Sequence, residues 1–94
     1  MSKQIKCIHA IVHGQVQGVF FRETTCQEAQ KLGLIGWVRN LADGTVESEF
    51  QGEEGTVERL LEWLLQGSPM SHVTRVDNRE TDPVSGETEF AITW

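Results

Sequence analysis

The sequence has 94 residues, of which 38% are hydrophobic and 23% charged, and its formal net charge is -6 at pH 7. These values predict one folded domain with a single small core and exclude a disordered chain. Because proteins that bind nucleic acids usually present a basic face to the phosphates, the acidic balance predicts no nucleic-acid partner.

The first predicted element is a β-strand over residues 6–13, a segment rich in β-branched side chains. Apolar residues occupy every second position of this segment and predict its core face: Ile8, Ala10 and Val12. A loop is predicted over residues 14–19, because Gly14 and Gly18 interrupt both the strand and the helix periodicity. The chain is therefore expected to run from a strand through a glycine loop into the next element.

A helix is predicted from Phe21, with core-facing residues that recur at helical spacing: Phe21, Thr25, Ala29 and Leu32. Gly33 follows and predicts the end of this helix. Residues 34–39 predict a second strand and residues 45–51 a third, since Val46 and Phe50 alternate with acidic residues. Asp43-Gly44 between these strands is typical of a hairpin turn.

A second helix is predicted after residues 52–55, where acidic side chains suit the positive end of a helix dipole. Its apolar stripe has helical spacing: Val57, Leu60, Leu61 and Leu64. Gly67 and Pro69 predict its end. Residues 73–76 predict a fourth strand, and the alternation of apolar residues over 90–94 predicts a last one.

This order predicts an α+β protein with a ferredoxin-like α/β sandwich, a βαββαβ arrangement plus a further C-terminal strand. The two helices are expected on one face of an antiparallel sheet, with residues 1–94 forming one domain. In such a fold Cys7 points to the sheet face opposite the helix that carries Cys26. We therefore expect two free thiols and no disulfide.

The glycine loop is the first candidate for a functional site. Backbone N–H groups of such a loop can converge on an anion, and the start of a helix adds partial positive charge. Arg22 lies in the first turn of the predicted helix, where a cation is disfavoured unless an anion is bound. Its planar donors match phosphate oxygens. The alternative is a solvated arginine, or one that is paired with Glu23 or another acid.

Asn40 is the second candidate, at the end of the second predicted strand. Its amide can both accept a hydrogen bond from a water molecule and donate one to it. The alternative is an asparagine that closes the following turn through its own backbone, which is common.

Two segments resemble the sequence motifs of the acylphosphatase family. Residues 14–22, Gly-Gln-Val-Gln-Gly-Val-Phe-Phe-Arg, are similar to its signature G-x-V-Q-G-V-x-F-R, and residues 36–47 are similar to its second motif, G-x-V-x-N-x-x-D-G-x-V-E. The resemblance covers essentially the whole chain and implies the same ferredoxin-like fold. It also implies hydrolysis of the carboxyl–phosphate bond of acyl phosphates to a carboxylate and inorganic phosphate, without a metal or cofactor.

The resemblance also implies roles for individual residues. The loop over residues 15–20 is expected to bind the phosphoryl group through its backbone: Gln15, Val16, Gln17, Gly18, Val19 and Phe20. Arg22 is expected to bind the same phosphate, and Asn40 to orient the attacking water. Gln15 stands where many members carry Lys or Arg, and the missing charge is expected to weaken substrate attraction.

Acyl phosphate hydrolysis needs few side chains. The leaving carboxylate has a pKa of about 4, so it departs without a strong general acid. Positioning and electrostatic stabilisation carry most of phosphoryl transfer, and a loop of amides, one Arg and one Asn can supply both. Water is expected to lose its proton to the substrate phosphate itself.

Two other function classes are alternatives to an acylphosphatase. A phosphate-binding or regulatory module would bind phosphate without turning over any acyl phosphate. An RNA-binding domain can share the βαββαβ layout, but residues 45–51 lack the aromatic platform of such domains and the charge is unfavourable. His9 and His13 would be about 13 Å apart on a strand, too far for one metal ion.

The sequence also bears on location and assembly. No apolar run approaches the roughly 20 residues that span a bilayer, and no signal peptide is evident. We expect a cytoplasmic protein with reduced thiols, no membrane association and a small-molecule substrate as its partner. A monomer is expected, since the apolar stripes are accounted for by the core.

Overall fold

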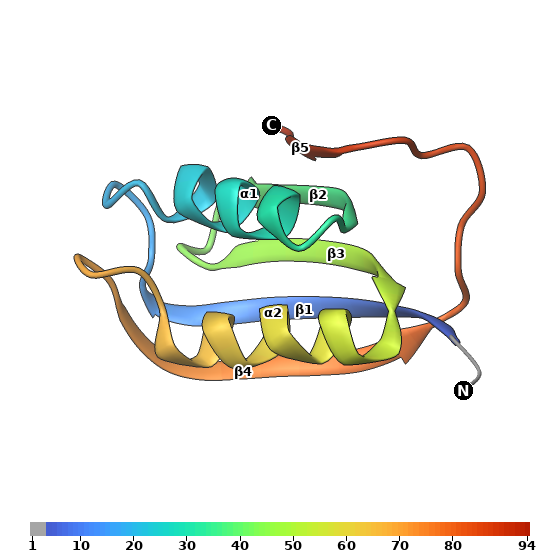
Figure 1. Ribbon diagram of the computed structural model, residues 1–94. Coiled ribbons are helices and arrows are strands. Elements are labelled where there is room, and N and C mark those ends of the chain that lie inside the picture. The colour runs from blue at the N-terminus through green and yellow to red at the C-terminus, as the bar shows by residue number, and fades with distance from the viewer. Residues whose placement is uncertain (1–3) are drawn as a thin grey trace.

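The computed structural model describes residues 4–94 and consists of strands and helices in the predicted order. Their bounds are β1 (Ile5–Gln15), α1 (Phe21–Lys31), β2 (Ile35–Asn40), β3 (Val46–Glu53), α2 (Glu54–Gln66), β4 (His72–Thr81) and β5 (Phe90–Ile92). The strands form one sheet in the order β4-β1-β3-β2-β5, and both helices lie on the same face of it (Figure 1). The ferredoxin-like prediction is confirmed.

The sheet contains both antiparallel and parallel strand pairs, because its last strand runs parallel to its neighbour. The pairs β1–β3, β1–β4 and β2–β3 are antiparallel, as predicted. The further C-terminal strand is also confirmed, but β5 runs parallel to β2 at the edge of the sheet opposite β4. The chain reaches that edge through residues 82–89, so β5 enters the sheet in the same direction as β2 (Figure 1).

The hydrophobic core lies between the sheet and the two helices. It contains the predicted faces of the strands and helices: Ile8, Ala10, Val12, Phe21, Ala29, Val46, Phe50, Val57, Leu60 and Leu64. Burial of a Val, Leu, Ile or Phe side chain contributes about 1.5–3 kcal/mol, so this cluster is the main source of stability. None of the helices in residues 4–94 is long and apolar enough to cross a membrane.

Most strand boundaries differ from the prediction by one or two residues, and that of β4 differs by more. Gly14 was expected in the loop but belongs to β1, where the pairing with β4 shifts register between His13 and Gly14. A Cβ atom on Gly14 would lie 2.0 Å from the carbonyl oxygen of His72, so only glycine permits this close approach of the strands. β4 extends to Thr81, beyond the predicted 73–76, because backbone pairing with β1 continues along a polar, exposed segment.

The two cysteines lie in different surroundings. Cys7 and Cys26 are both free, and Cys7 is buried outside the core cluster. Gln51 pairs with Cys7 across the strands and exchanges two hydrogen bonds with the backbone of Val84, at 2.7 and 3.0 Å. Burial raises the pKa of both thiols, which disfavours the reactive thiolate at neutral pH.

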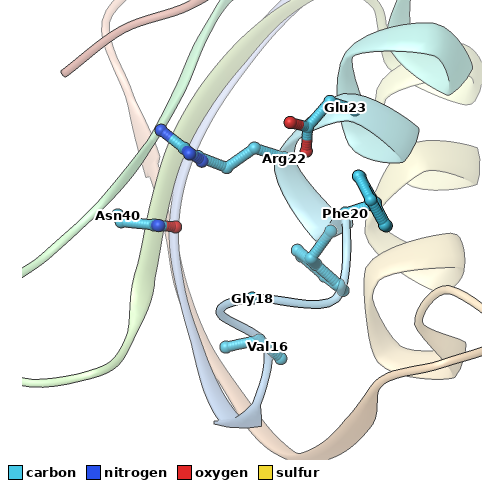
Figure 2. Close-up of a pocket in the computed structure, with 7 residues that line it drawn as sticks. Val16, Gly18, Phe20, Arg22, Glu23 and Asn40 are labelled. Carbon is cyan, nitrogen blue, oxygen red and sulfur yellow. The ribbon is translucent and has the colours of Figure 1, made fainter.

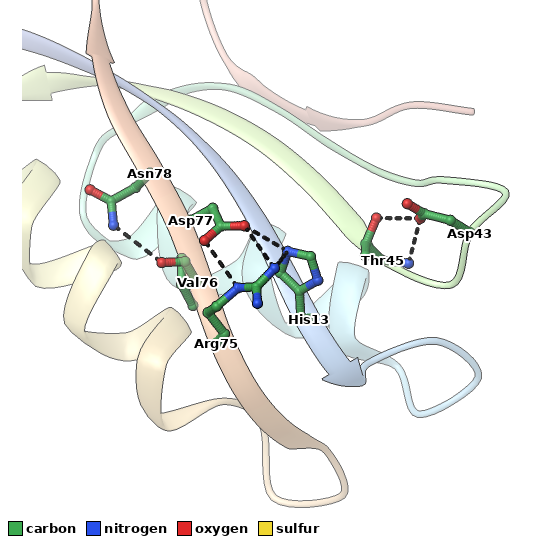
Figure 3. Close-up of polar contacts among 7 residues, drawn as sticks. All are labelled: His13, Asp43, Thr45, Arg75, Val76, Asp77 and Asn78. Atoms are coloured by element: carbon green, nitrogen blue, oxygen red, sulfur yellow. Dashed lines mark hydrogen bonds and ion pairs between the residues drawn. The ribbon is translucent and has the colours of Figure 1, made fainter.

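The sheet face away from the helices carries two ion-pair clusters. His13 contacts Asp77 at 2.9 Å, and Arg75 also contacts Asp77 (Figure 3). His9 contacts Glu47 at 2.7 Å instead, so the two histidines have different carboxylate partners. Within residues 4–94 no group of three or more His, Cys, Asp and Glu side chains could hold a metal ion.

Glu47 gives a prediction about stability and pH. Burial alone would raise the pKa of Glu47, but hydrogen bonds from His9 and Arg39 outweigh it and lower that pKa below its usual value. A lowered pKa stabilises the fold above the unfolded-state value, and this contribution disappears as the pH falls through the folded-state value. We expect Glu47→Gln to lower the free energy of unfolding by about 1–2 kcal/mol at pH 7.

Urea denaturation at pH 7 and at pH 3 measures this difference. Because this contribution is lost as the pH falls through the lowered pKa of Glu47, the difference between wild type and Glu47→Gln is expected to be smaller at pH 3 than at pH 7. Glu58→Gln, on the exposed face of α2, is the matched control and is expected to change little at either pH. An equal loss in the free energy of unfolding of Glu47→Gln at both pH values would contradict the ionic origin of the effect.

Candidate active site

The loop over residues 15–20 connects β1 to α1 and has an unusual backbone. Gly18 has φ +75° and Phe20 φ +59°, both in the left-handed region. Phe20 lacks the freedom of glycine, so this conformation costs about 1–2 kcal/mol, and its side chain is 74% exposed, which leaves little packing to offset the cost. Strained residues of this kind gather at binding and catalytic sites, which favours a functional role for the loop.

The start of α1 offers free backbone donors beside this loop. Phe20 is the N-cap residue, and no side chain caps the helix there. The Phe20 carbonyl oxygen accepts hydrogen bonds from the N–H and the Oγ1 of Thr24. The N–H groups of the first turn precede the first helical hydrogen bond, so an anion is a suitable acceptor for them.

A pocket of about 160 Å³ lies against the loop and the first turn of α1. It is lined by Val16, Gly18, Phe20, Phe21, Arg22, Glu23 and Asn40 (Figure 2). One water molecule accounts for about 30 Å³ of liquid, so this volume accommodates a phosphoryl group together with a water. The two candidate side chains from separate elements, Arg22 from α1 and Asn40 from β2, therefore border one cavity.

Arg22 extends from α1 across the pocket toward the strand that carries Asn40 (Figure 2). Among residues 4–94, no carboxylate lies within ion-pair distance of its guanidinium, so the alternative of pairing with Glu23 is not found. Its recorded contact is with the ring of Trp94, whose centroid lies 4.2 Å from Cζ. The N–H groups of Arg22 are thus available to an anion.

Asn40 is the last residue of β2, and its side chain points toward the loop (Figure 2). Its Oδ1 is buried and has no hydrogen-bond partner within the described chain. Leaving such a group unpaired costs about 1–3 kcal/mol, so a bound water or ligand is its natural partner. Asn40 Oδ1 is therefore placed to orient a molecule inside the pocket.

The turn after Asn40 is closed by another residue. Asp43 Oδ1 accepts hydrogen bonds from the N–H of Thr45 at 3.0 Å and from its Oγ1 at 2.5 Å (Figure 3). The side-chain hydrogen bond from Thr45 is the main reason why the pKa of Asp43 is lowered. Because Asp43 closes the turn, the side chain of Asn40 is not needed for that purpose.

Gln17 joins the loop to this hairpin. Its Nε2 donates to the carbonyl oxygens of Leu41 and Thr45, at 2.8 Å each. The side chain of Gln17 therefore faces the hairpin, and it is not among the residues that line the pocket. The two hydrogen bonds hold the loop at a fixed position relative to the end of β2, where Asn40 lies.

This contact predicts that Gln17→Ala lowers kcat/KM for an acyl phosphate by about 10- to 100-fold, because small misplacements of catalytic groups are costly. Losing two hydrogen bonds is expected to lower the free energy of unfolding by about 1–3 kcal/mol. Activity at 25 °C and urea denaturation measure the two effects. Gln27→Ala, on the exposed face of α1, is the control; equal activity of the two variants would contradict the positioning role.

The remaining predicted residues of the loop lie outside the pocket lining. Gln15 is exposed at the end of β1, and Val19 packs against the hydrophobic core. Their backbone contacts with a phosphate remain predictions. Phe21 and Glu23 line the pocket although the sequence analysis did not select them for it. Their position on either side of Arg22, in the first turn of the helix, could have indicated them.

Comparison with known proteins gives consistent matches. The acylphosphatase family model matches residues 8–92. An acylphosphatase of Methylococcus capsulatus is 47% identical over 89 residues, which are 94% of this chain and 96% of that protein. The crystal structure of acylphosphatase from Bacillus subtilis has a TM-score of 0.90 and 37% identity, and the match covers 97% of this chain and 100% of that one. An acylphosphatase structure from Coxiella burnetii has a TM-score of 0.90 and 40% identity, with 99% of each chain covered.

Proposed function

The chain belongs to the acylphosphatase family, and from this membership and the pocket geometry we propose how it hydrolyses acyl phosphates. The products are a carboxylate and inorganic phosphate. The observation that supports the proposal most strongly is that Arg22 and Asn40, from α1 and β2, line the same pocket as the loop over residues 15–20. The pocket thus combines anion donors with a buried side-chain acceptor.

The phosphoryl group binds to the backbone N–H groups of the loop and to the guanidinium of Arg22. These donors neutralise charge on the oxygens of the phosphoryl group, which carry the negative charge in the transition state. Because the donors are fixed by the fold before substrate arrives, little reorganisation accompanies the reaction. The overall charge of -6 does not oppose this step at short range, since the local donors are positive.

The attacking water binds to Asn40. Oδ1 accepts a hydrogen bond from the water and directs its oxygen toward phosphorus. The new bond forms between water oxygen and phosphorus, the bond between phosphorus and the carboxyl oxygen breaks, and its electron pair leaves with the carboxylate. A proton of the water passes to a phosphate oxygen. The carboxylate, with a pKa of about 4, departs without a general acid, and no step requires a metal or cofactor.

Hydrolysis of benzoyl phosphate by the purified protein, with and without a chelator, tests this function. We expect release of inorganic phosphate at the same rate in both. Binding of inorganic phosphate without hydrolysis of any acyl phosphate would favour the phosphate-binding module instead. A chelator-sensitive rate would contradict the metal-independent reaction.

We propose further that the enzyme acts as a monomer in the cytoplasm. The free thiols of Cys7 and Cys26 and the absence of an apolar stripe beyond the core in the sequence support this part of the proposal. Light scattering after gel filtration tests the monomer, with an expected mass near 10.6 kDa.

A further inference from the structure

Trp94 lies beside the candidate active site but has no role in the proposed reaction. The residue is 86% exposed, although large aromatic side chains are usually buried where the fold allows it. The centroid of the ring lies 4.2 Å from the Cζ atom of Arg22, with the guanidinium over the ring. This is the geometry of a cation–π contact. Burial therefore does not explain the position of Trp94, whereas the contact with Arg22 does.

β5 brings Trp94 to this place. Gly36, Trp37 and Val38 of β2 pair with Phe90, Ala91 and Ile92, and the N–H of Thr93 donates to the carbonyl oxygen of Val38 at 2.8 Å. Continuing this register by two residues sets Trp94 beside Asn40. Since side chains alternate along a strand, Trp94 shares the face of buried Phe90, which is the face that carries the helices and Arg22.

We propose that Trp94 is a positioning residue that holds the guanidinium of Arg22 over the pocket. The guanidinium lies over the ring, and its N–H groups that do not meet the ring stay available for phosphate oxygens. A long side chain that is already held in place loses less conformational freedom when the substrate binds. This inference rests on the proposed function, because it assigns to Trp94 an effect on the phosphate site of that reaction.

A second arginine–tryptophan pair on the opposite face of the sheet provides a control. Arg39 lies over the ring of Trp37, with Cζ 5.3 Å from the centroid. Arg39 also contacts Glu47 at 2.6 Å and is not among the residues that line the pocket. Replacing Trp37 removes a contact of the same type without touching Arg22.

The experiment compares Trp94→Leu and Trp94→Phe with wild type by calorimetric titration with inorganic phosphate and by steady-state kinetics. Leucine keeps apolar bulk but has no aromatic face, whereas phenylalanine keeps a face. An exposed cation–π contact corresponds to an affinity change of about two- to fivefold. We expect Trp94→Leu to raise the Kd for phosphate and the KM by that factor, with kcat within about twofold, because the cost of ordering a free Arg22 side chain is paid when the substrate binds, before the chemical step.

The outcomes separate this inference from the proposed function. Trp94→Phe is expected to keep most of the phosphate affinity, and Trp37→Leu all of it. If Trp94→Leu binds phosphate as tightly as wild type, or if Trp94→Phe is as weak as Trp94→Leu, the positioning role is wrong while the proposed function stands. If wild type neither binds phosphate nor hydrolyses acyl phosphates, the proposed function itself is wrong.

Discussion

Asn40→Ala is expected to lower kcat by about 10²- to 10³-fold, the usual loss when one oriented polar group of a catalytic site is removed. The Kd for inorganic phosphate is expected to change by less than about threefold, because the loop and Arg22 still bind the anion. The variant should therefore separate water positioning from phosphate binding. Its stability gives a second test, since Asn40 Oδ1 is buried without a partner within residues 4–94.

Removing that unpaired oxygen relieves its desolvation cost, so we expect the free energy of unfolding of Asn40→Ala to stay equal or to rise by up to about 1–2 kcal/mol. Initial rates with benzoyl phosphate, phosphate calorimetry and urea denaturation measure the three quantities. Asn78→Ala, whose side chain is exposed on β4, is the matched control. A variant with full activity would show that Asn40 does not orient the water; a variant that loses phosphate binding would show that it binds the phosphate instead.

The core was predictable because its residues recur with the period of the element that carries them. Val57, Leu60 and Leu64 lie on one face of α2 for the same reason that Val46 and Phe50 lie on one face of β3. The periodicity of apolar residues does not predict a strand end that is set only by backbone pairing with another strand. For this reason the end of β4 at Thr81 and the inclusion of Gly14 in β1 were missed, since both depend on contact between strands that are distant in sequence.

The site was predictable only in part. Spacing alone left Arg22 and Asn40 as two weak candidates, and the motif resemblance selected them together. Their common pocket depends on the strand order, which places β2 next to the start of α1 only after the sheet has formed. The backbone of Gln17 was expected at the phosphate, but no role was predicted for its side chain, which bonds to the hairpin carbonyls. Its length and its two amide donors fit this role, but sequence spacing gives no orientation for a loop side chain.

An acidic protein with a phosphate site needs a local source of positive charge. The overall charge is -6, and Glu23 adds a carboxylate to the pocket lining. Backbone N–H groups contribute partial charges that do not appear in a count of side chains. Arg22 is therefore the one full positive charge among the residues that line the pocket, and its removal should have the largest effect.

Arg22→Ala is expected to lower kcat/KM for an acyl phosphate by about 10³-fold or more, a loss typical of arginines that stabilise phosphoryl transfer. The Kd for inorganic phosphate should rise by more than about tenfold, because a charge-assisted, two-pronged contact is lost. Arg22→Lys keeps the positive charge but lacks the planar pair of donors. We expect its kcat/KM to be about tenfold higher than that of Arg22→Ala and still well below that of wild type.

The fold should not suffer from this change. A cation in the first turn of α1 opposes the helix dipole by about 0.3–1 kcal/mol, and Arg22 has no carboxylate partner within the described residues. Relief of that cost offsets the lost contact with Trp94, so we expect the free energy of unfolding of Arg22→Ala to change little. Arg59→Ala, exposed on α2, serves as the control for the loss of one positive charge and is expected to keep its activity. If Arg22→Ala and Arg59→Ala lose the same small fraction of kcat/KM, general attraction of the anion rather than a specific contact explains the role of Arg22. A large loss of kcat/KM for Arg22→Ala alone, without a loss of stability, would show that Arg22 binds the phosphate directly. The positive charge at the start of α1 would then serve substrate binding and not the stability of the fold.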